Sequence, residues 1–468
     1  MKRGVLWWGV GLLLLSLLVR AGWLVLFPAD PLEPVDAKGY HLLARNLLAG
    51  QGFSLKWSAP FCPDTIRTPL YPLFLAATYR LLGFEPVCAV LVQLLLETLT
   101  TALAFRLGRE LGGARVGWVA ALCYALNGST QRYTGSLYAE TLLLPVVAVA
   151  LWVSLLAFKR ATPGRVILAA FCWGLAVLTK PNVQFLALAV GLLGALYPLF
   201  VPRPARFTFY ASRAGLYFIT LLAVLAPWLL RNQRLLDRWL LSTAFEENLA
   251  RVSAIATLAE VEGVCVAPWT PTWEHYYLSA IVDAAMVRFE RGARAESGDV
   301  CHVSRLRHHE MGIVAREIVF EYPRAALAAH VRGVGRSLLD IGHRKWYPVL
   351  TGREWESTGV LSDIWSRMRE SLRIGAVGDA FHALWLERVV CIPPLAGVLW
   401  WGLLMGRVVL WMLCVRGALR LWCAWPAAAL LLLGTIAYFI VLPGPIAYDR
   451  FYLPAIPAVV LLAALEFR

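Results

Sequence analysis

The stretch VLWWGVGLLLLSLLVRAGWLVLF, which runs from Val5 to Phe27, is almost continuously apolar. As a helix it is long enough to cross a hydrocarbon core of roughly 30 Å. Lys2 and Arg3 precede it, and the apolar run is too long for the core of a signal peptide and has no small-residue cleavage site before Pro28. We therefore expect a membrane anchor whose N-terminus lies in the cytoplasm.

The composition of the whole chain is that of a membrane protein. Of its 468 residues 59% are hydrophobic and 16% are charged, and the mean hydropathy is +0.63. Soluble globular chains are nearer half apolar and a quarter charged. These values exclude disordered, collagen-like, coiled-coil and small disulfide-rich proteins. The net charge of +14 therefore bears first on topology, and we predict no nucleic-acid partner.

Apolar runs of about 17 to 25 residues predict an α-helical polytopic membrane protein with about ten transmembrane helices. They cover residues 5–27, 86–107, 115–130, 141–158, 166–180, 183–201, 214–230, 389–413, 421–441 and 451–467. We expect three parts: an N-terminal transmembrane module (1–230), an outer region (231–388) and C-terminal transmembrane helices (389–468).

Cations collect in alternate short loops between these spans, as the positive-inside rule predicts for cytoplasmic loops. This places both termini in the cytoplasm, and the excess of Arg over Lys hints at a bacterial protein of the inner membrane. The loop cations are Arg106, Arg109, Arg115, Lys159, Arg160, Arg165, Arg203, Arg206, Arg213, Arg416 and Arg420.

The same alternation places two long segments, 28–85 and 231–388, on the outer face, and all eight His lie in them. Within the first, the apolar stretch from Pro69 to Leu82 is expected to lie in the membrane interface. Within the second, residues 325–341 have the period of an amphipathic surface helix. The rest of the outer region is expected to be mixed and mainly helical.

Asp36 opens a helical pattern just beyond the first span. It stands where an N-cap would be, which is one interpretation. A carboxylate near the bilayer surface is equally suited to take a proton from an acceptor hydroxyl as a general base.

Five further ionisable residues are expected at the outer ends of the spans, where charge is costly and hence a sign of function. Simpler interpretations exist for three of them: Arg67 as a headgroup anchor, Glu140 as a partner of a helix dipole, and Lys180 as a snorkelling cation. Arg231 and Arg450 are predicted at the same depth. Cations with one or two carboxylates suit a phosphate-bearing ligand plus a base.

At these residues the chain resembles the GT-C membrane glycosyltransferases, in the branch of the protein O-mannosyltransferases and lipid A aminoarabinose transferases. Six motifs in order carry the resemblance, and residues 242–379 are unmatched. The motifs are Asp36 to Ala44 with Gly50-Gln51-Gly52-Phe53, Arg67-Thr68-Pro69-Leu70-Tyr71-Pro72, Ser136 to Glu140, Gly174 to Pro181, Pro227 to Asn232, and Arg450 to Pro457.

The resemblance implies a sugar donor on a polyprenyl phosphate and an inverting displacement in which Asp36 is the catalytic base. The acceptor would be a saccharide, a lipid or a protein. The residues assigned by this resemblance to donor binding are Tyr40, Arg67, Glu140, Lys180, Arg231 and Arg450.

Two departures from the family pattern limit what the resemblance implies. Val35 precedes Asp36 where the protein mannosyltransferases have an Asp-Glu pair, which counts against a protein acceptor. Ile66 precedes Arg67 where some aminoarabinose transferases have a metal-binding Glu, so no metal and no other cofactor is predicted. A second possible metal site is not predicted either, because adjacent His point different ways on a helix; its residues are His302, His308, His309 and Glu310.

Nine Cys are present without a C-x-x-C pair, which argues against a zinc or redox motif. Cys265 and Cys301 both fall in the outer region, where oxidising conditions permit a disulfide. We expect this pair, with Cys62 as the competing partner.

Two other functions compete with a transferase. A transporter or flippase of a lipid-linked saccharide should have repeated halves and interrupted helices at mid-membrane, and neither is visible in the sequence. A non-catalytic partner in a cell-envelope complex would be indifferent to the loss of Asp36.

Overall fold

The computed structural model describes residues 2–28, 30–200, 207–264, 271–292, 300–339, 394–446 and 449–468. Over these residues the chain is helical and has no strand, apart from an isolated bridge between Ser54 and Pro63. The predicted class, an α-helical polytopic membrane protein, is confirmed.

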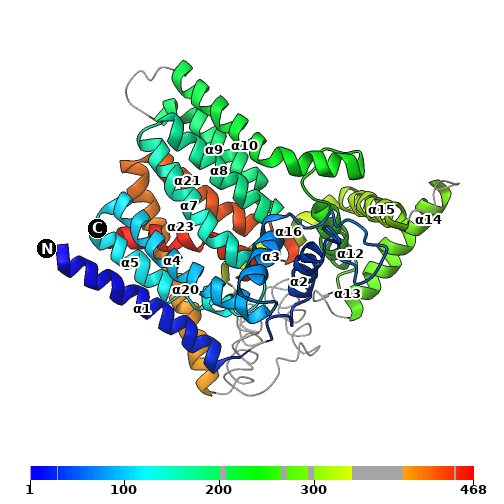
Figure 1. The fold of residues 1–468 in the computed structure, drawn as a ribbon, viewed down its shortest axis with the longest axis horizontal. Helices are drawn as coiled ribbons and strands as arrows, with labels where there is room; N and C mark the ends of the chain where they lie inside the picture. Colours follow the sequence, from blue (N-terminus) through cyan, green and yellow to red (C-terminus); the bar gives the residue numbers. More distant parts are fainter. Residues whose placement is uncertain are drawn as a thin grey trace, which may run out of the picture.

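Over the described residues, every predicted span coincides with one or more helices of the bundle in Figure 1. The first five residues of the predicted span 389–413 lie outside the described residues. Among the described residues, six segments are long and apolar enough to cross a membrane, and four other apolar helices are shorter. The bundle helices are α1 (Lys2–Leu26), α4 (Pro86–Gly112), α5 (Ala114–Ala125), α7 (Ala139–Lys159), α8 (Pro163–Thr179), α9 (Gln184–Leu196), α10 (Phe207–Leu236), α20 (Pro394–Ala424), α21 (Pro426–Val441) and α23 (Ile456–Ala464).

Two predicted spans have different bounds. The run 115–130 is two helices, α5 and α6 (Gly128–Thr134), because Asn127 caps the second one by accepting a hydrogen bond from the Thr130 amide. Arg416 and Arg420 were expected in a loop but lie in the last turns of α20. Their guanidinium groups lie 3.3 and 3.2 Å from the Glu466 carboxylate. Because this pairing compensates their charges within the helix, α20 continues past them and the chain turns at Trp425.

Helix α7 shows how the two ends of the bundle differ. Lys159 at its C-terminal end binds the Glu110 carboxylate at 2.6 Å and lies 5.5 Å from the Trp425 ring, so basic loops meet there. Glu140 begins the same helix, and a rise of 1.5 Å per residue puts it about 28 Å from Lys159. The basic loops and the candidate site therefore lie at opposite ends of the bundle, roughly one hydrocarbon thickness apart.

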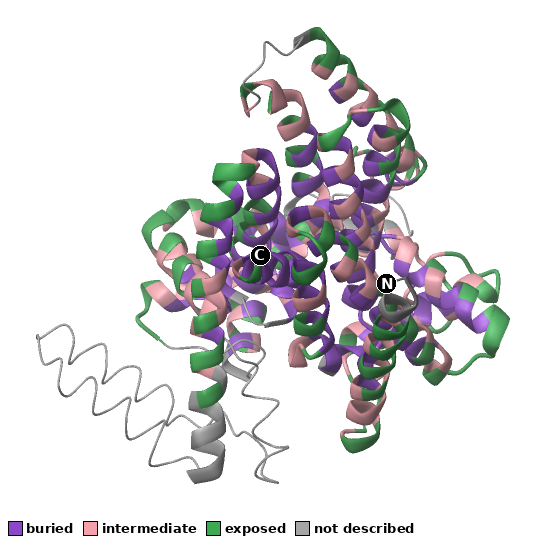
Figure 2. Cartoon of the chain, turned by 90° about the vertical axis from the view of Figure 1, so that its left-hand side faces the viewer, coloured by how far each residue is buried: buried purple, intermediate pink, exposed green. Residues whose placement is uncertain are grey.

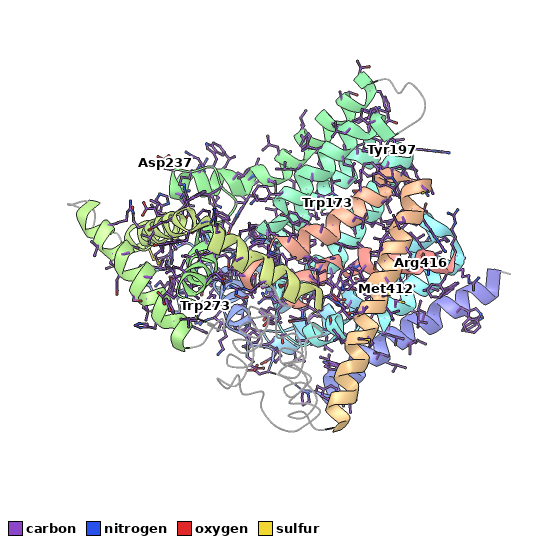
Figure 3. All side chains as sticks on the ribbon, turned by 180° about the vertical axis from the view of Figure 1, so that it is seen from behind. Trp173, Tyr197, Asp237, Trp273, Met412 and Arg416 are labelled. Carbon is purple, nitrogen blue, oxygen red and sulfur yellow. A yellow bond between two sulfur atoms is a disulfide. The ribbon has the colours of Figure 1, made fainter. Side chains whose placement is uncertain are left out.

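Buried residues fill the centre of the bundle, whereas α1 packs only along one side (Figure 2). Trp173 of α8 is fully buried in this core and donates a hydrogen bond to Ser154 at 3.0 Å. A separate core in the outer region surrounds Trp273 (Figure 3). Among the described residues, the bundle and the region 231–388 thus each have a core of their own.

Helices α2 (Val35–Leu48) and α3 (Leu70–Leu82) pack together at the end of the bundle that carries the candidate site. The described helices of the outer region lie beside them (Figure 1). Among these, α16 (Pro323–Leu339) is helical as predicted, but its predicted apolar face is only partly covered. Val334 and Leu338 pack on the bundle core, whereas Leu327 and Val331 are exposed. The other outer helices are α11 (Ala244–Asn248), α12 (Ile255–Val261), α13 (Pro271–Tyr276), α14 (Asp283–Gly292) and α15 (Val300–Glu321).

The predicted disulfide between Cys265 and Cys301 is wrong. Cys301 of α15 pairs with Cys62, the competing partner, and Cys265 lies outside the described residues. The physical reason is that the first outer loop packs on the outer region, where Thr65 accepts a backbone hydrogen bond from Thr243 at 2.9 Å. This packing brings Cys62 to Cys301 across a long sequence separation.

Candidate functional site

The site is centred on an ion pair between Glu140 and Arg450. Glu140 lies in the first turn of α7, and 1% of its side chain is exposed. Arg450, in the short helix α22 (Asp449–Tyr452), places Nε 2.6 Å from Glu140 Oε1 and Nη2 3.4 Å from Oε2. Such two-pronged pairing is the strongest geometry available to a carboxylate and a guanidinium. Glu140 therefore orients Arg450 rather than only balancing the dipole of α7.

Lys180 is the second cation on Glu140. Its Nζ lies 2.5 Å from Glu140 Oε1 and 5.3 Å from the centre of the Phe451 ring. Pro181 ends α8 because it cannot continue the helical hydrogen bonds, and Lys180 adopts an extended conformation at this break. The ammonium group is turned to a buried partner, so snorkelling does not account for its position.

Asp36 is the second carboxylate, and it contacts the same arginine. The N-cap of α2 is Pro34, so the N-cap interpretation of Asp36 is wrong. Its Oδ2 lies 2.7 Å from Arg450 Nη2 and its Oδ1 3.5 Å from Arg67 Nη2. Desolvation by itself raises the pKa of Asp36, but the charges of Arg450 and Arg67 outweigh it and hold that pKa below its usual value.

Arg67 is held by the turn that precedes α3. Asp64 Oδ2 accepts a hydrogen bond from the Arg67 amide at 2.9 Å. The guanidinium lies 5.2 Å from the centre of the Tyr40 ring and packs on Gly39, where a Cβ would come within 2.6 Å of Nη2. Only 15% of this side chain is exposed, so Arg67 is part of the site rather than a headgroup anchor.

Tyr40 forms one wall of the site. Its ring meets the Tyr71 ring edge-on at 4.8 Å. Burial, followed by the charge of Asp36, raises the pKa of the Tyr40 phenol, so this hydroxyl stays protonated.

Arg231 lies apart from the two carboxylates. Its Nη2 donates to the backbone carbonyl of Asp64 at 2.9 Å, and its guanidinium lies 4.3 Å from the Trp228 ring and 5.3 Å from the Phe53 ring. The expected convergence of Arg231 with the other cations is therefore indirect: it supports the turn that carries Arg67. Its predicted role in donor binding stays a prediction.

Three cations surrounding two carboxylates leave one uncompensated positive charge in the site. One carboxylate, Glu140, is buried, whereas 42% of the Asp36 side chain is exposed. Such an arrangement can bind an anion next to a carboxylate that is accessible to a second substrate. Tyr138, whose ring lies 4.0 Å from the Arg450 guanidinium, also belongs to it and was missed.

Over the described residues, no three His, Cys, Asp or Glu side chains are grouped so as to hold a metal ion. In the His-rich segment of α15, His309 Nδ1 lies 3.3 Å from Glu246, and Glu310 pairs with Arg288 at 3.6 Å. These two residues therefore have partners other than a shared metal.

Three buried charges inside the bundle were also missed. Arg20, Glu97 and Arg407 lie in α1, α4 and α20 and have at most 9% of their surface exposed. Each interrupts an apolar run, which is the signal that could have revealed them. Arg407 Nε donates to the Leu338 carbonyl at 3.2 Å, so it binds the C-terminal end of α16.

The comparison with protein families agrees with this geometry. Residues 66–230 match the family described as dolichyl-phosphate-mannose-protein mannosyltransferase. This stretch, the matched module, covers about a third of the chain. The match confirms the resemblance predicted from the motifs, and the module contains Arg67, Glu140 and Lys180. No curated protein sequence matches the chain.

Two solved structures show what the chain is similar to beyond this module. The archaeal oligosaccharyltransferase AglB from Archaeoglobus fulgidus, in complex with an inhibitory peptide and a dolichol-phosphate, is 16% identical with a TM-score of 0.49. The match covers 98% of this chain and 50% of AglB, so this chain spans about half the length of that enzyme. ArnT from Cupriavidus metallidurans bound to undecaprenyl phosphate is 15% identical, with 99% and 77% covered and a TM-score of 0.42.

Proposed function

We propose that this protein transfers a monosaccharide from a polyprenyl-phosphate donor to an acceptor hydroxyl at the outer face of a bacterial inner membrane, with inversion. The observation that supports this most is the position of Arg450, which binds both the exposed Asp36 and the buried Glu140. The Arg450 guanidinium can therefore bind a donor phosphate while it also contacts Asp36, the proposed base.

The charge of the site suits the donor. A sugar linked to a prenyl phosphate is a phosphodiester with one negative charge, which the single uncompensated cation of the site matches. When the sugar leaves, the prenyl phosphate gains a second negative charge. Arg67, Lys180 and Arg450 are close enough to stabilise that developing charge in a site shielded from water.

Asp36 is the residue placed to act as the base. It removes the proton from the acceptor hydroxyl while the hydroxyl oxygen bonds to the anomeric carbon, and the bond from that carbon to the phosphate oxygen breaks on the opposite side. Without donor, Arg450 keeps Asp36 ionised and weakly basic. A donor phosphate that draws Arg450 away would raise the pKa of Asp36, so its basicity would increase only when donor is bound.

The orientation follows from the loop cations. Because basic loops collect on the cytoplasmic side of bacterial membranes, the end of the bundle that carries Lys159 and Trp425 faces the cytoplasm. Asp36, at the opposite end, then faces the periplasm or the cell exterior, where a donor already carried across the membrane would meet its acceptor.

A transporter of a lipid-linked saccharide is the alternative function. Its substrate site would lie near the midplane, whereas Asp36, Arg67, Glu140, Lys180 and Arg450 gather at one end of the bundle. Their position supports a transferase.

The test is sugar transfer by purified protein in liposomes, with a panel of polyprenyl-phosphate sugars and an envelope extract as acceptor. Asp36→Asn is expected to lower kcat on the order of 100-fold, the usual contribution of a general base, with donor binding retained. Glu33→Gln, which changes an exposed carboxylate in the same loop, is the control. Full activity of the Asp36→Asn protein would exclude the assigned base.

A further inference from the structure

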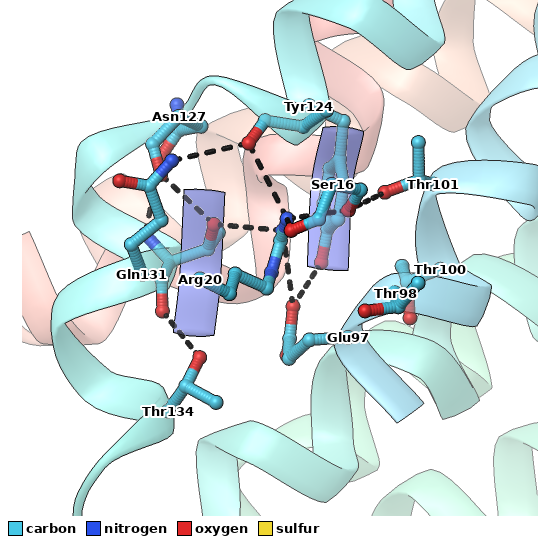
Figure 4. Close-up of polar contacts among 12 residues, drawn as sticks. Ser16, Arg20, Glu97, Thr98, Thr100, Thr101, Tyr124, Asn127, Gln131 and Thr134 are labelled. Atoms are coloured by element: carbon cyan, nitrogen blue, oxygen red, sulfur yellow. Dashed lines mark hydrogen bonds and ion pairs between the residues drawn. The ribbon is translucent and has the colours of Figure 1, made fainter. Parts of the chain in front are cut away.

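A buried polar network joins α1 to three other elements inside the bundle (Figure 4). Arg20 Nη1 donates to Ser16 Oγ at 2.7 Å and to the Ala125 carbonyl at 3.3 Å, and Nη2 donates to Thr130 Oγ1 at 3.3 Å. Arg20 Nη2 also lies 3.8 Å from the Glu97 carboxylate. Neither Arg20 nor Glu97 takes part in the proposed sugar transfer.

Glu97 is held from a second side. The Tyr124 hydroxyl donates to Glu97 Oε2 at 2.6 Å, and Ser16 and Thr101 hydroxyls lie 2.8 Å apart between α1 and α4. A buried ion pair contributes little net stability, since desolvation offsets the attraction. Its hydrogen bonds are directional and fit the helix register seen here, whereas apolar contact between α1 and its neighbours is non-directional.

We propose that the network around Arg20 and Glu97 sets the distance between Asp36 and Glu140, so that one arginine can bind both. This inference rests on the proposed function. Arg20 is a positioning residue here, because it acts through the chain segments that it holds.

Those segments lead directly to the two carboxylates. Arg20 lies near the outer end of α1, and the chain passes from there through a short loop to Asp36. Thr130 lies in α6, and the chain passes from it to Glu140 at the start of α7. Arg20 therefore joins α1, which precedes the segment of Asp36, to α6, which precedes Glu140.

A second set of contacts joins the same segments nearer the site. The Leu137 amide donates to the Pro31 carbonyl at 3.2 Å. Leu24, one turn after Arg20, packs against the buried cluster that contains Tyr40 and Leu137, and it fills the space that a Cβ on Gly135 would take. A shift of α1 would therefore be passed on to Asp36.

Helix α4 contributes a further contact one turn from Glu97. Gln93 Nε2 donates to the carbonyls of Thr134 and Ser136 at 3.0 and 3.1 Å, and Gln93 Oε1 accepts from the Tyr71 hydroxyl at 2.7 Å. Polar contacts with Gln93 therefore fix the segment between α6 and Glu140. Helix α4 contacts both α1 and α6.

The test uses a double variant, Arg20→Met with Glu97→Gln, which removes both charges of the network together. Since a displacement of about 1 Å in a catalytic geometry costs on the order of 100-fold, we expect kcat to fall at least about 10-fold while the KM for donor changes less than twofold. The single variant Arg20→Lys, which keeps a cation beside Glu97, should have a higher kcat than the double variant. Arg80→Met, which changes an exposed cation of α3, is the control.

A second readout is independent of catalysis. A protein with both Pro31→Cys and Leu137→Cys reports how close the two segments lie, through the rate at which the new thiols form a disulfide in membranes. The double variant should slow this cross-linking several-fold. An unchanged rate together with an unchanged kcat would overturn the inference, whereas slower cross-linking in a chain without transferase activity would support the positioning role and reject only the proposed function.

Discussion

Arg450 places Nη2 2.7 Å from Asp36 and Nε 2.6 Å from Glu140. The two carboxylates come from α2 and α7, and the arginine comes from the C-terminal part of the chain. Their meeting makes Arg450 the point through which donor binding can alter the base.

Arg450→Lys should reduce kcat by at least about 10-fold, because a lysine cannot contact Asp36 and Glu140 at once with a planar fork. Donor affinity should also weaken. Sugar transfer and donor binding by the purified variant measure both effects. Arg80→Lys is the matched control, and wild-type kinetics in Arg450→Lys would show that the two-carboxylate contact is dispensable.

The pH profile should reflect the lowered pKa of Asp36. A base must be ionised, so activity is expected to persist as the pH falls and to be lost only below the ordinary aspartate range. Arg67→Gln removes one of the charges that lower this pKa, so the acidic limb should move to higher pH. The measurement is kcat/KM against pH in both proteins. An acidic limb near neutrality in the parent protein would contradict the assignment of Asp36.

Gly39→Ala should weaken donor binding. The new Cβ would come within 2.6 Å of Arg67 Nη2 and force the guanidinium away from Asp36. We expect an increase in donor KM of several-fold with little loss of thermal stability, because the end of the Arg67 side chain can move. Gly164→Ala is the control, since no atom lies within 4 Å of a Cβ there. Equal KM values in the two variants would count against Arg67 as a donor ligand.

Cys62→Ser and Cys301→Ser should each release the first outer loop from α15 and lower the Tm in the same way. The pair joins segments separated by 239 residues, so the unfolded chain gains freedom when it is lost. Peptide mapping under non-reducing conditions should recover Cys62 linked to Cys301. A peptide linking Cys265 to Cys301 would show that the assigned pairing is incorrect.

The sequence was sufficient to predict the helical membrane class, the helix that starts near Pro69, and the candidate residues at the ends of the spans. These features depend on local hydropathy and charge, which a chain displays without knowledge of its packing. The cost of placing a charge in an apolar run also made Lys180 conspicuous. The same argument applies to Arg20 and Glu97, although neither was singled out.

Only the tertiary structure decided which groups share a partner. Arg450 meets Asp36 and Glu140, Arg231 turns instead to the carbonyl of Asp64, and Cys301 pairs with Cys62. Each of these contacts joins residues distant in sequence, and its geometry is set by how the helices pack. The sequence by itself thus determined which residues could carry the chemistry, whereas helix packing determined which of them act together.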